Sequence, residues 1–150
     1  MNDQNVIPGH LKNTLYFMLQ TPLTDELASA FEEVLSSLPK RRRWVIDSPQ
    51  LVDYIETDGG NNKEAHTYGG AVQLYSALPP WGDKLPKEVD KAHYEEVSLI
   101  VDELKALSKR FNCDFALQLD QTHVGYIRAG LPDESIRVGL LGEWEKALRG

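Results

Sequence analysis

The sequence is poor in cysteine and lacks long apolar runs. Cys113 is the one cysteine among 150 residues, so no internal disulfide can form. It stands beside an apolar run, which predicts a buried, unreactive thiol and a reducing compartment. No apolar run approaches the roughly 20 residues that span a bilayer, and the first residues lack the basic start and apolar core of a secretory signal. We therefore expect a cytoplasmic protein without a membrane partner.

Basic residues are also scarce. Sixteen Lys and Arg residues stand against 23 Asp and Glu residues, which gives a formal net charge of −7. A protein that binds nucleic acid needs a positive surface against the phosphates, so we expect no nucleic-acid partner. The one basic run, Lys40–Arg43, follows an expected helix, where its charge complements the helix dipole. Where the acids cluster, the charge favours a basic protein partner.

The sequence motifs of common enzymes are missing as well. There is no G-x-S-x-G, no G-x-x-x-x-G-K-[ST] and no G-x-G-x-x-G. His10, His66 and His93 do not follow the H-E-x-x-H spacing of zinc enzymes. Glu95 and Glu96 are neighbours on an expected helix, where adjacent side chains diverge, so we expect both to be solvated. These absences predict no cofactor, no metal and no catalytic residue.

One pair of residues leaves an enzymatic alternative open. Asp120 and His123 stand three residues apart between two apolar runs. A carboxylate and an imidazole at this spacing are candidates for acid–base or metal chemistry. The competing interpretation is a hairpin loop over Asp120–His123, because Asp and Thr side chains readily bond local backbone groups in turns. We expect the hairpin loop.

The pattern of apolar residues predicts a sheet with helices on one face. Thr14–Gln20 is an expected strand, and Thr24 is an expected N-cap for a helix that stops at Pro39. Arg43–Asp47 is expected to form a second strand, which Ser48 and Pro49 interrupt near a sheet edge and Leu51–Glu56 continues. Tyr68–Leu78 is the expected third strand and pairs with the second as a hairpin.

The second half of the chain alternates helix, strands and helix. A long helix begins near Pro86, and two strands follow, over Phe115–Asp120 and Val124–Arg128. A last helix places four apolar side chains on one face: Ile136, Leu140, Trp144 and Leu148. We therefore predict one α+β domain over residues 1–150, with residues 1–12 as a flexible N-terminus. Its antiparallel sheet has the ferredoxin-like β-α-β-β-α-β order, plus a C-terminal β-hairpin strand and a helix.

The central region combines acidic residues with large aromatics outside the clearest apolar stripes. If the second and third strands form a hairpin, several of these acids gather along one sheet edge. Such a surface suits a protein partner better than a small substrate. The predicted partner-binding residues are Asp47, Asp53, Glu56, Asp58, Trp81 and Asp83.

Three segments of the C-terminal third follow one another in a characteristic order. Asp114–Asp120 is an apolar strand that ends in Asp, Val124–Gly130 contains V-G-x-I, and Gly139–Trp144 contains L-L-x-x-W. Together with the upstream helix around His93–Val97, this pattern over residues 89–148 resembles small immunity proteins of bacterial polymorphic toxin systems. The resemblance implies a non-enzymatic cytoplasmic protein that neutralises a cognate toxin domain, delivered by a contact-dependent or type VI route, by occluding its active site.

The same residues also have a structural meaning. Gly125 permits a close approach to its strand, Gly130 permits a turn conformation, and Trp144 is an expected core anchor. No binding residue carries over from the resemblance, since immunity interfaces vary with their toxins. Two alternatives stay open: a structural or regulatory module that self-associates through a sheet edge, and a small enzyme that uses Asp120 and His123. The chain is expected to be a monomer or a homodimer.

Overall fold

The computed structural model describes residues 12–58, 63–75 and 86–149. As expected, the chain is α+β with an antiparallel sheet, whose six strands lie in the order β2-β3-β1-β4-β5-β6. The elements, in chain order, are β1 (Asn13–Leu19), α1 (Asp25–Arg41), β2 (Gln50–Asp58), β3 (Lys63–Leu74), α2 (Lys87–Phe111), β4 (Asp114–Leu119), β5 (Thr122–Arg128), β6 (Leu131–Pro132), the π-helix η1 (Ser135–Gly142) and α3 (Glu143–Arg149). The expected flexible segment 1–12 lies outside the described residues, apart from Lys12.

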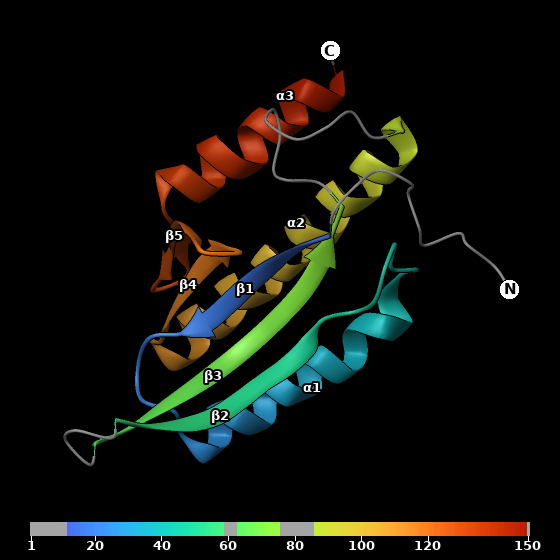
Figure 1. Cartoon of the computed structure of the whole chain (residues 1–150). Coiled ribbons are helices and arrows are strands. Elements are labelled where there is room, and N and C mark those ends of the chain that lie inside the picture. Colours follow the sequence, from blue (N-terminus) through green and yellow to red (C-terminus); the bar gives the residue numbers. More distant parts are fainter. Residues whose placement is uncertain (1–11, 59–62, 76–85, 150) are drawn as a thin grey trace, which may run out of the picture.

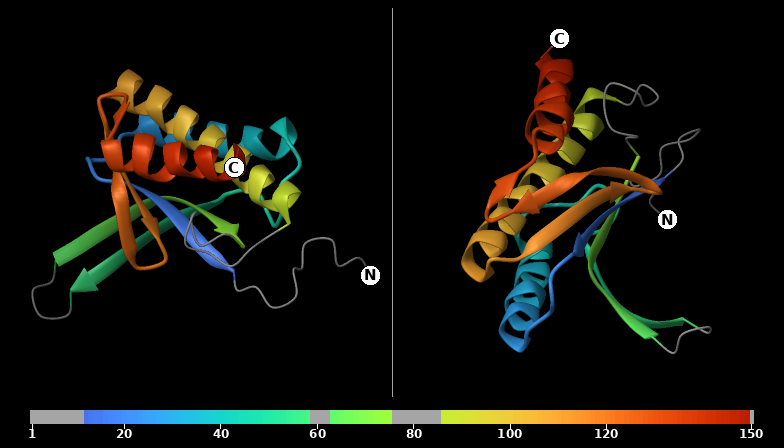
Figure 2. Two further views of the ribbon diagram at one scale, coloured as in Figure 1. Left: turned by 90° about the horizontal axis from the view of Figure 1, so that it is seen from above. Right: turned by 90° about the vertical axis from the view of Figure 1, so that its left-hand side faces the viewer.

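The helices α1 and α2 cover one face of this sheet. Figure 1 looks onto the opposite face, and both views of Figure 2 place α1 and α2 on the same side of the strands. β1 lies in the middle, antiparallel to β3 on one side and to β4 on the other. Toward its tip, the β2–β3 hairpin curves away from the helices (Figure 2). No helix of the described residues therefore covers the other face of the sheet or this end of the hairpin.

Helix α1 begins as the sequence predicts but ends later. The Thr24 hydroxyl caps it by accepting a hydrogen bond from the Leu27 N–H at 3.2 Å. The expected stop at Pro39 is wrong, because the helix continues to Arg41. A proline removes one backbone donor and crowds the preceding turn, and in the last turn this cost affects only the end of the helix.

The expected strand over Arg43–Asp47 is also wrong. This segment is irregular, and two of its polar groups bond to helices instead of a neighbouring strand. The buried Trp44 ring donates its N–H to the Leu38 carbonyl at 2.9 Å, and the Val45 N–H donates to Glu96 Oε2 at 2.6 Å. The strand β2 begins only after Pro49.

The predicted hairpin of the second and third strands is confirmed. β2 pairs with β3 from Gln50 opposite Ala71 to Asp58 opposite Lys63. β3 starts earlier than the expected Tyr68 and ends at Leu74. Ser48 and Pro49 before Leu51 predicted a position near a sheet edge, and β2 is an edge strand of the sheet. A proline directly before an edge strand costs no ladder hydrogen bond.

The core lies between the sheet and the helices. The Phe31 ring on α1 packs against Phe17, Tyr68 and Phe115 from three strands, with ring centroids 6.2, 5.4 and 5.9 Å away. The apolar stripe of α2 is buried as the periodicity predicts, and its members are Val97, Ile100, Val101, Leu104 and Leu107.

The C-terminal elements close the sheet on the β5 side. Trp144 is fully buried, as expected of a core anchor, and its ring N–H donates to Asp90 on α2 at 2.9 Å. A Cβ on Gly125 would overlap the Ser135 hydroxyl and Ile136 of η1, so the glycine lets η1 lie against β5. Gly130 has φ +78°, which confirms the predicted turn. The last helical segment differs from the expected single helix, because it starts as the π-helix η1 and continues as α3.

Candidate functional site

The two edges of the sheet differ, and the β2 edge is the candidate site. In the part of the chain that the structure describes, no strand pairs with the outer side of β2. An edge strand presents backbone N–H and C=O groups at every second residue without a partner in the sheet. Such an edge is available to bind another polypeptide segment.

Apolar side chains are exposed along β2. Leu51 is 41% exposed, Tyr54 47% and Ile55 59%. Tyr54 shares one face of the strand with Val52, while Leu51 and Ile55 share the other, because successive side chains alternate. Both faces of the strand therefore offer apolar surface to a partner.

Two of the predicted acidic residues stand among these side chains. Asp53 and Glu56 are exposed on β2, and Asp53 Oδ1 lies 2.6 Å from His66 Nε2 on β3. Since they are three residues apart on a strand, their side chains project to opposite faces. The acids therefore flank Tyr54 and Ile55 on both sides of the strand.

The other predicted site residues lie at or beyond the ends of this strand. Asp47 is exposed in the irregular segment before β2. Asp58 is the last residue of β2, opposite Lys63 in the register. Trp81 and Asp83 lie outside the described residues. Trp44, the other aromatic residue outside the apolar stripes, fills the core and is not part of an exposed surface.

A further acid from α1 lies close to the same hairpin. The Tyr68 hydroxyl on β3 donates to Glu32 Oε2 at 2.9 Å. Burial of the tyrosine, followed by its hydrogen bond to Glu32, raises the Tyr68 pKa above its ordinary value. Tyr68 therefore stays a neutral donor. Glu32 adds negative charge to the helix side of the hairpin, and the nearby charge of Asp53 also raises the Tyr68 pKa.

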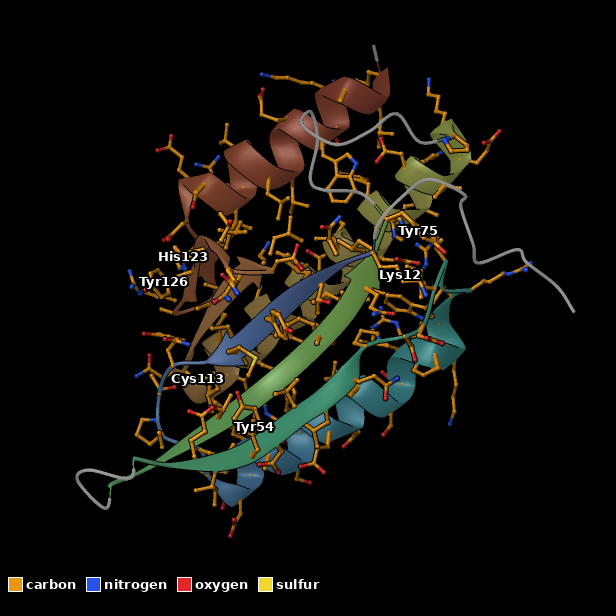
Figure 3. All side chains as sticks on the ribbon, in the orientation of Figure 1. Lys12, Tyr54, Tyr75, Cys113, His123 and Tyr126 are labelled. Atoms are coloured by element: carbon orange, nitrogen blue, oxygen red, sulfur yellow. The ribbon has the colours of Figure 1, made fainter. Side chains whose placement is uncertain are left out.

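The uncovered face of the sheet is hollowed next to β2. Its groove has a volume of about 580 Å³. Figure 3 looks onto this face, with Tyr54 on one side of β1 and His123 and Tyr126 on the other. The residues that line the groove are Tyr16, Met18, Val52, Tyr54, Thr67, Gln118, Asp120 and Gln121. Tyr54 thus joins the β2 edge to an apolar and amide-rich hollow.

Asp120 and His123 each have a structural partner. Asp120 adopts φ 51° in the turn, and its Oδ1 accepts a hydrogen bond from the Thr14 N–H at 2.9 Å. The His123 ring lies with its centroid 4.6 Å from that of Tyr126. The turn is tighter than the expected loop, since Thr122 and His123 already belong to β5. Among the residues that the structure covers, no group of three or more His, Cys, Asp or Glu side chains could hold a metal ion.

A buried polar network was missed by the sequence interpretation. Glu96 is buried, which contradicts the expectation that Glu95 and Glu96 are both solvated. His93 Nε2 accepts a hydrogen bond from the Tyr75 N–H at 3.1 Å, so its Nδ1–H donates to Glu96 Oε1 at 2.9 Å. Glu96 Oε2 in turn accepts from the Val45 N–H.

This network has a structural role. It ties the end of β3 and the irregular segment before β2 to α2, at backbone groups that have no sheet partner. The signal was present in the sequence, because His93 and Glu96 fall on the same helix face as Val97 and Ile100.

Cys113 is buried, as expected. Its thiol donates to the Leu107 carbonyl at 3.6 Å, and burial raises the Cys113 pKa to about 11. The thiolate is the nucleophilic form of cysteine, so this side chain is unreactive near neutral pH.

Comparisons with protein-family models, with curated proteins and with solved structures found no match. Within the described residues, no helix has the length and apolar character needed to cross a membrane. The candidate site therefore rests on the geometry of the β2 edge.

Proposed function

We propose that the protein is a cytoplasmic immunity protein that binds one cognate toxin domain and occludes its active site without catalysing a reaction. The observation that carries this proposal is the acidic β2 edge, which no described strand covers and on which Leu51, Tyr54 and Ile55 are exposed beside Asp53 and Glu56. An interface needs apolar area for affinity and complementary charge for specificity and rate of association, and this strand offers both.

The charge of the chain supports the same proposal. A formal net charge of −7 attracts basic partners, and a nuclease groove that binds phosphate is basic. The interface that we propose is centred on Asp53 and Glu56 and includes the other predicted residues, Asp47, Asp58, Trp81 and Asp83. We place no nucleic acid, membrane, metal or cofactor at this surface.

The resemblance to immunity proteins implies a fold as well as a function. We propose that the first six elements follow the ferredoxin-like pattern. The position of β1 between β3 and β4, with α1 and α2 on one face, supports this assignment. β5 and β6 extend the sheet beyond that pattern.

Capture of the partner from the native host tests the function. The tagged chain is immobilised at low and at moderate salt, next to the variant Asp53→Lys/Glu56→Lys, and bound proteins are identified by mass spectrometry. We expect one stoichiometric partner, the C-terminal domain of a large secreted protein, which is toxic when expressed alone and harmless when co-expressed with this chain. The variant should bind it more slowly, with altered salt dependence. A partner that stays toxic on co-expression would exclude the immunity function.

A second candidate function is self-association into a structural or regulatory module. The observation that favours it is again the β2 edge, which lacks the lysine, proline or bulge that usually prevents pairing between edge strands. Light scattering over a range of concentrations tests it. A monomer at micromolar concentration would exclude this candidate.

A further inference from the structure

The β2 edge has the properties of a strand-binding site. It is nine residues long and pairs with β3 along its whole length without a register shift. Edge strands in natural proteins are usually short, bulged, covered or charged with lysine, because an open edge pairs with other chains. Within the described residues, β2 is neither short nor bulged and carries no lysine, and its charged side chains are all acidic, so the edge stays open to a basic ligand.

The side chains of β2 define what this ligand should look like. Asp53, Tyr54, Ile55 and Glu56 form a sequence of acid, apolar, apolar and acid. A strand added to the edge places one of its residues beside each of them, on the same face. The best complement is therefore basic, apolar, apolar and basic. This pattern reads the same in both directions, so it holds for a parallel and for an antiparallel ligand.

The contacts of Asp53 leave room for a cation. Its carboxylate pairs with His66 through Oδ1, yet both side chains stay exposed, 45% for Asp53 and 41% for His66. Glu56 on the other face of the strand is exposed as well. Neither acid is enclosed by the core, so a lysine or arginine can approach each of them from the open edge.

We propose that β2 binds an extended segment of a partner protein as an additional strand, and that this segment carries a basic-apolar-apolar-basic pattern beside Asp53–Glu56. The inference deepens the proposed function, on which it rests in taking the toxin domain as the source of the segment. Main-chain hydrogen bonds supply affinity in this binding mode, while the alternating side chains supply specificity.

A second copy of this chain fits the edge less well. Gln50–Asp58 contains three acidic residues, Asp53, Glu56 and Asp58, and no Lys or Arg. Two copies of the strand would bring like charges together. In the register that places Asp53 beside Glu56 of the partner copy, acids would face each other directly, which is destabilising. The charge therefore favours a basic ligand over self-pairing.

Peptide binding to the full chain tests the inference without a toxin. One labelled peptide of nine residues, the length of β2, carries a central Lys-Ile-Tyr-Lys flanked by Ser and Thr. A second replaces both lysines with Glu, and a third keeps the lysines but has N-methyl groups on alternate amides along one edge. Fluorescence anisotropy measures affinity, and hydrogen exchange locates the site. We expect the basic peptide to bind roughly tenfold or more tightly than the other two and to protect amides of Gln50–Asp58.

Charge reversal supplies the matched comparison. The variant Asp53→Lys/Glu56→Lys should prefer the acidic peptide. The control Asp102→Lys/Glu134→Lys makes the same change in net charge at exposed positions on α2 and before η1, and it should keep the preference for the basic peptide. A control that also switches its preference would show long-range attraction only and would overturn the inference.

Other outcomes also decide against the inference. Equal binding of the basic and acidic peptides would overturn it, as would N-methylation without effect, and neither comparison needs a variant to fold. A concentration-dependent dimer with protected β2 amides would assign the edge to a second copy.

The proposed function is tested separately from strand addition. If the peptides behave as expected but no toxic partner is captured, strand addition stands and the immunity function does not. If a toxin is neutralised while the amides of β2 stay unprotected from hydrogen exchange, only strand addition is excluded.

Discussion

The two edge strands of this sheet differ in length and in what covers them. At one edge, β6 has two residues, Leu131–Pro132, and η1 packs against it and β5. At the other edge, β2 has nine residues and no covering strand in the described structure. A short strand with a proline cannot accept another chain, whereas a long, regular strand can. The fold can therefore close an edge, and the open β2 edge is the one that we propose for binding.

This comparison predicts where substitutions act. Residues that cover the β5–β6 side should control stability and leave the binding of a partner unchanged in the folded molecule. Residues of β2 should control binding and change stability little. The predictions below run from the largest expected effect to the smallest.

The largest loss of stability is expected for Trp144→Ala. The Trp144 ring is fully buried and donates a hydrogen bond to Asp90, so truncation leaves a cavity and an unpaired acceptor. Removing a buried aromatic ring costs about 3–5 kcal/mol of the free energy of unfolding. Urea denaturation of the variant and the wild type measures this loss. The control is Tyr54→Ala on β2, which should cost less than about 1 kcal/mol because Tyr54 is half exposed. Equal losses would contradict the division between the two edges.

A smaller loss is expected for Glu96→Ala. The substitution leaves the Val45 N–H and the His93 Nδ1–H without their buried acceptor, which should cost about 2–4 kcal/mol. Glu95→Ala is the matched control, because Glu95 is adjacent, exposed and paired with Arg42 at 3.2 Å. A surface ion pair contributes roughly 0–1 kcal/mol. Denaturation of both variants under the same conditions separates the structural role of Glu96 from a loss of charge.

The next effect is a pH dependence on the covered side of the sheet. Burial raises the Cys113 pKa from 9.0 to about 11 in the folded protein. The unfolded chain therefore releases the thiol proton first, so the free energy of unfolding should fall as the pH rises from about 9 to about 11. The Cys113→Ala variant should show a flatter dependence over this range, measured by urea denaturation at each pH. A thiol reagent should modify the wild type slowly at pH 8 and rapidly in urea. Fast labelling of the folded chain would contradict the buried position.

The sequence predicted the elements best where a single physical pattern acts. The stripe of α2 and the face of Ile136, Leu140 and Trp144 were correct, because the spacing of apolar residues reports the buried face directly. Asp120 was correct as a turn residue, although its bond to Thr14 on another strand could not be foreseen from local spacing.

The errors over Arg43–Asp47 and Glu96 share one physical cause. Arg43–Asp47 has the composition of a strand, but Trp44 and Val45 bond to α1 and to Glu96, which are distant in sequence. Tertiary hydrogen bonds replaced the expected ladder. The acids of the candidate site were predicted to lie on a sheet edge because Pro49 precedes β2. The edge position of β2 is confirmed. Which charged side chains are buried depends on such distant partners, so the buried position of Glu96 was missed.

The smallest effect on stability is expected for Ile55→Lys. This variant separates binding from stability at the β2 edge most clearly. Ile55 is 59% exposed on β2, so its substitution should change the free energy of unfolding by no more than about 0.5 kcal/mol. Lysine at an edge opposes strand pairing, and its charge repels a basic ligand, so binding of the basic peptide should be lost. Val138→Lys is the control, since it adds the same charge at an exposed apolar position on η1 and should leave peptide binding near the wild-type level. A stability loss above about 1 kcal/mol for Ile55→Lys would place Ile55 in the core. Retained binding would remove β2 from the interface, because a lysine in the middle of an added-strand site leaves no way for a basic segment to pair there.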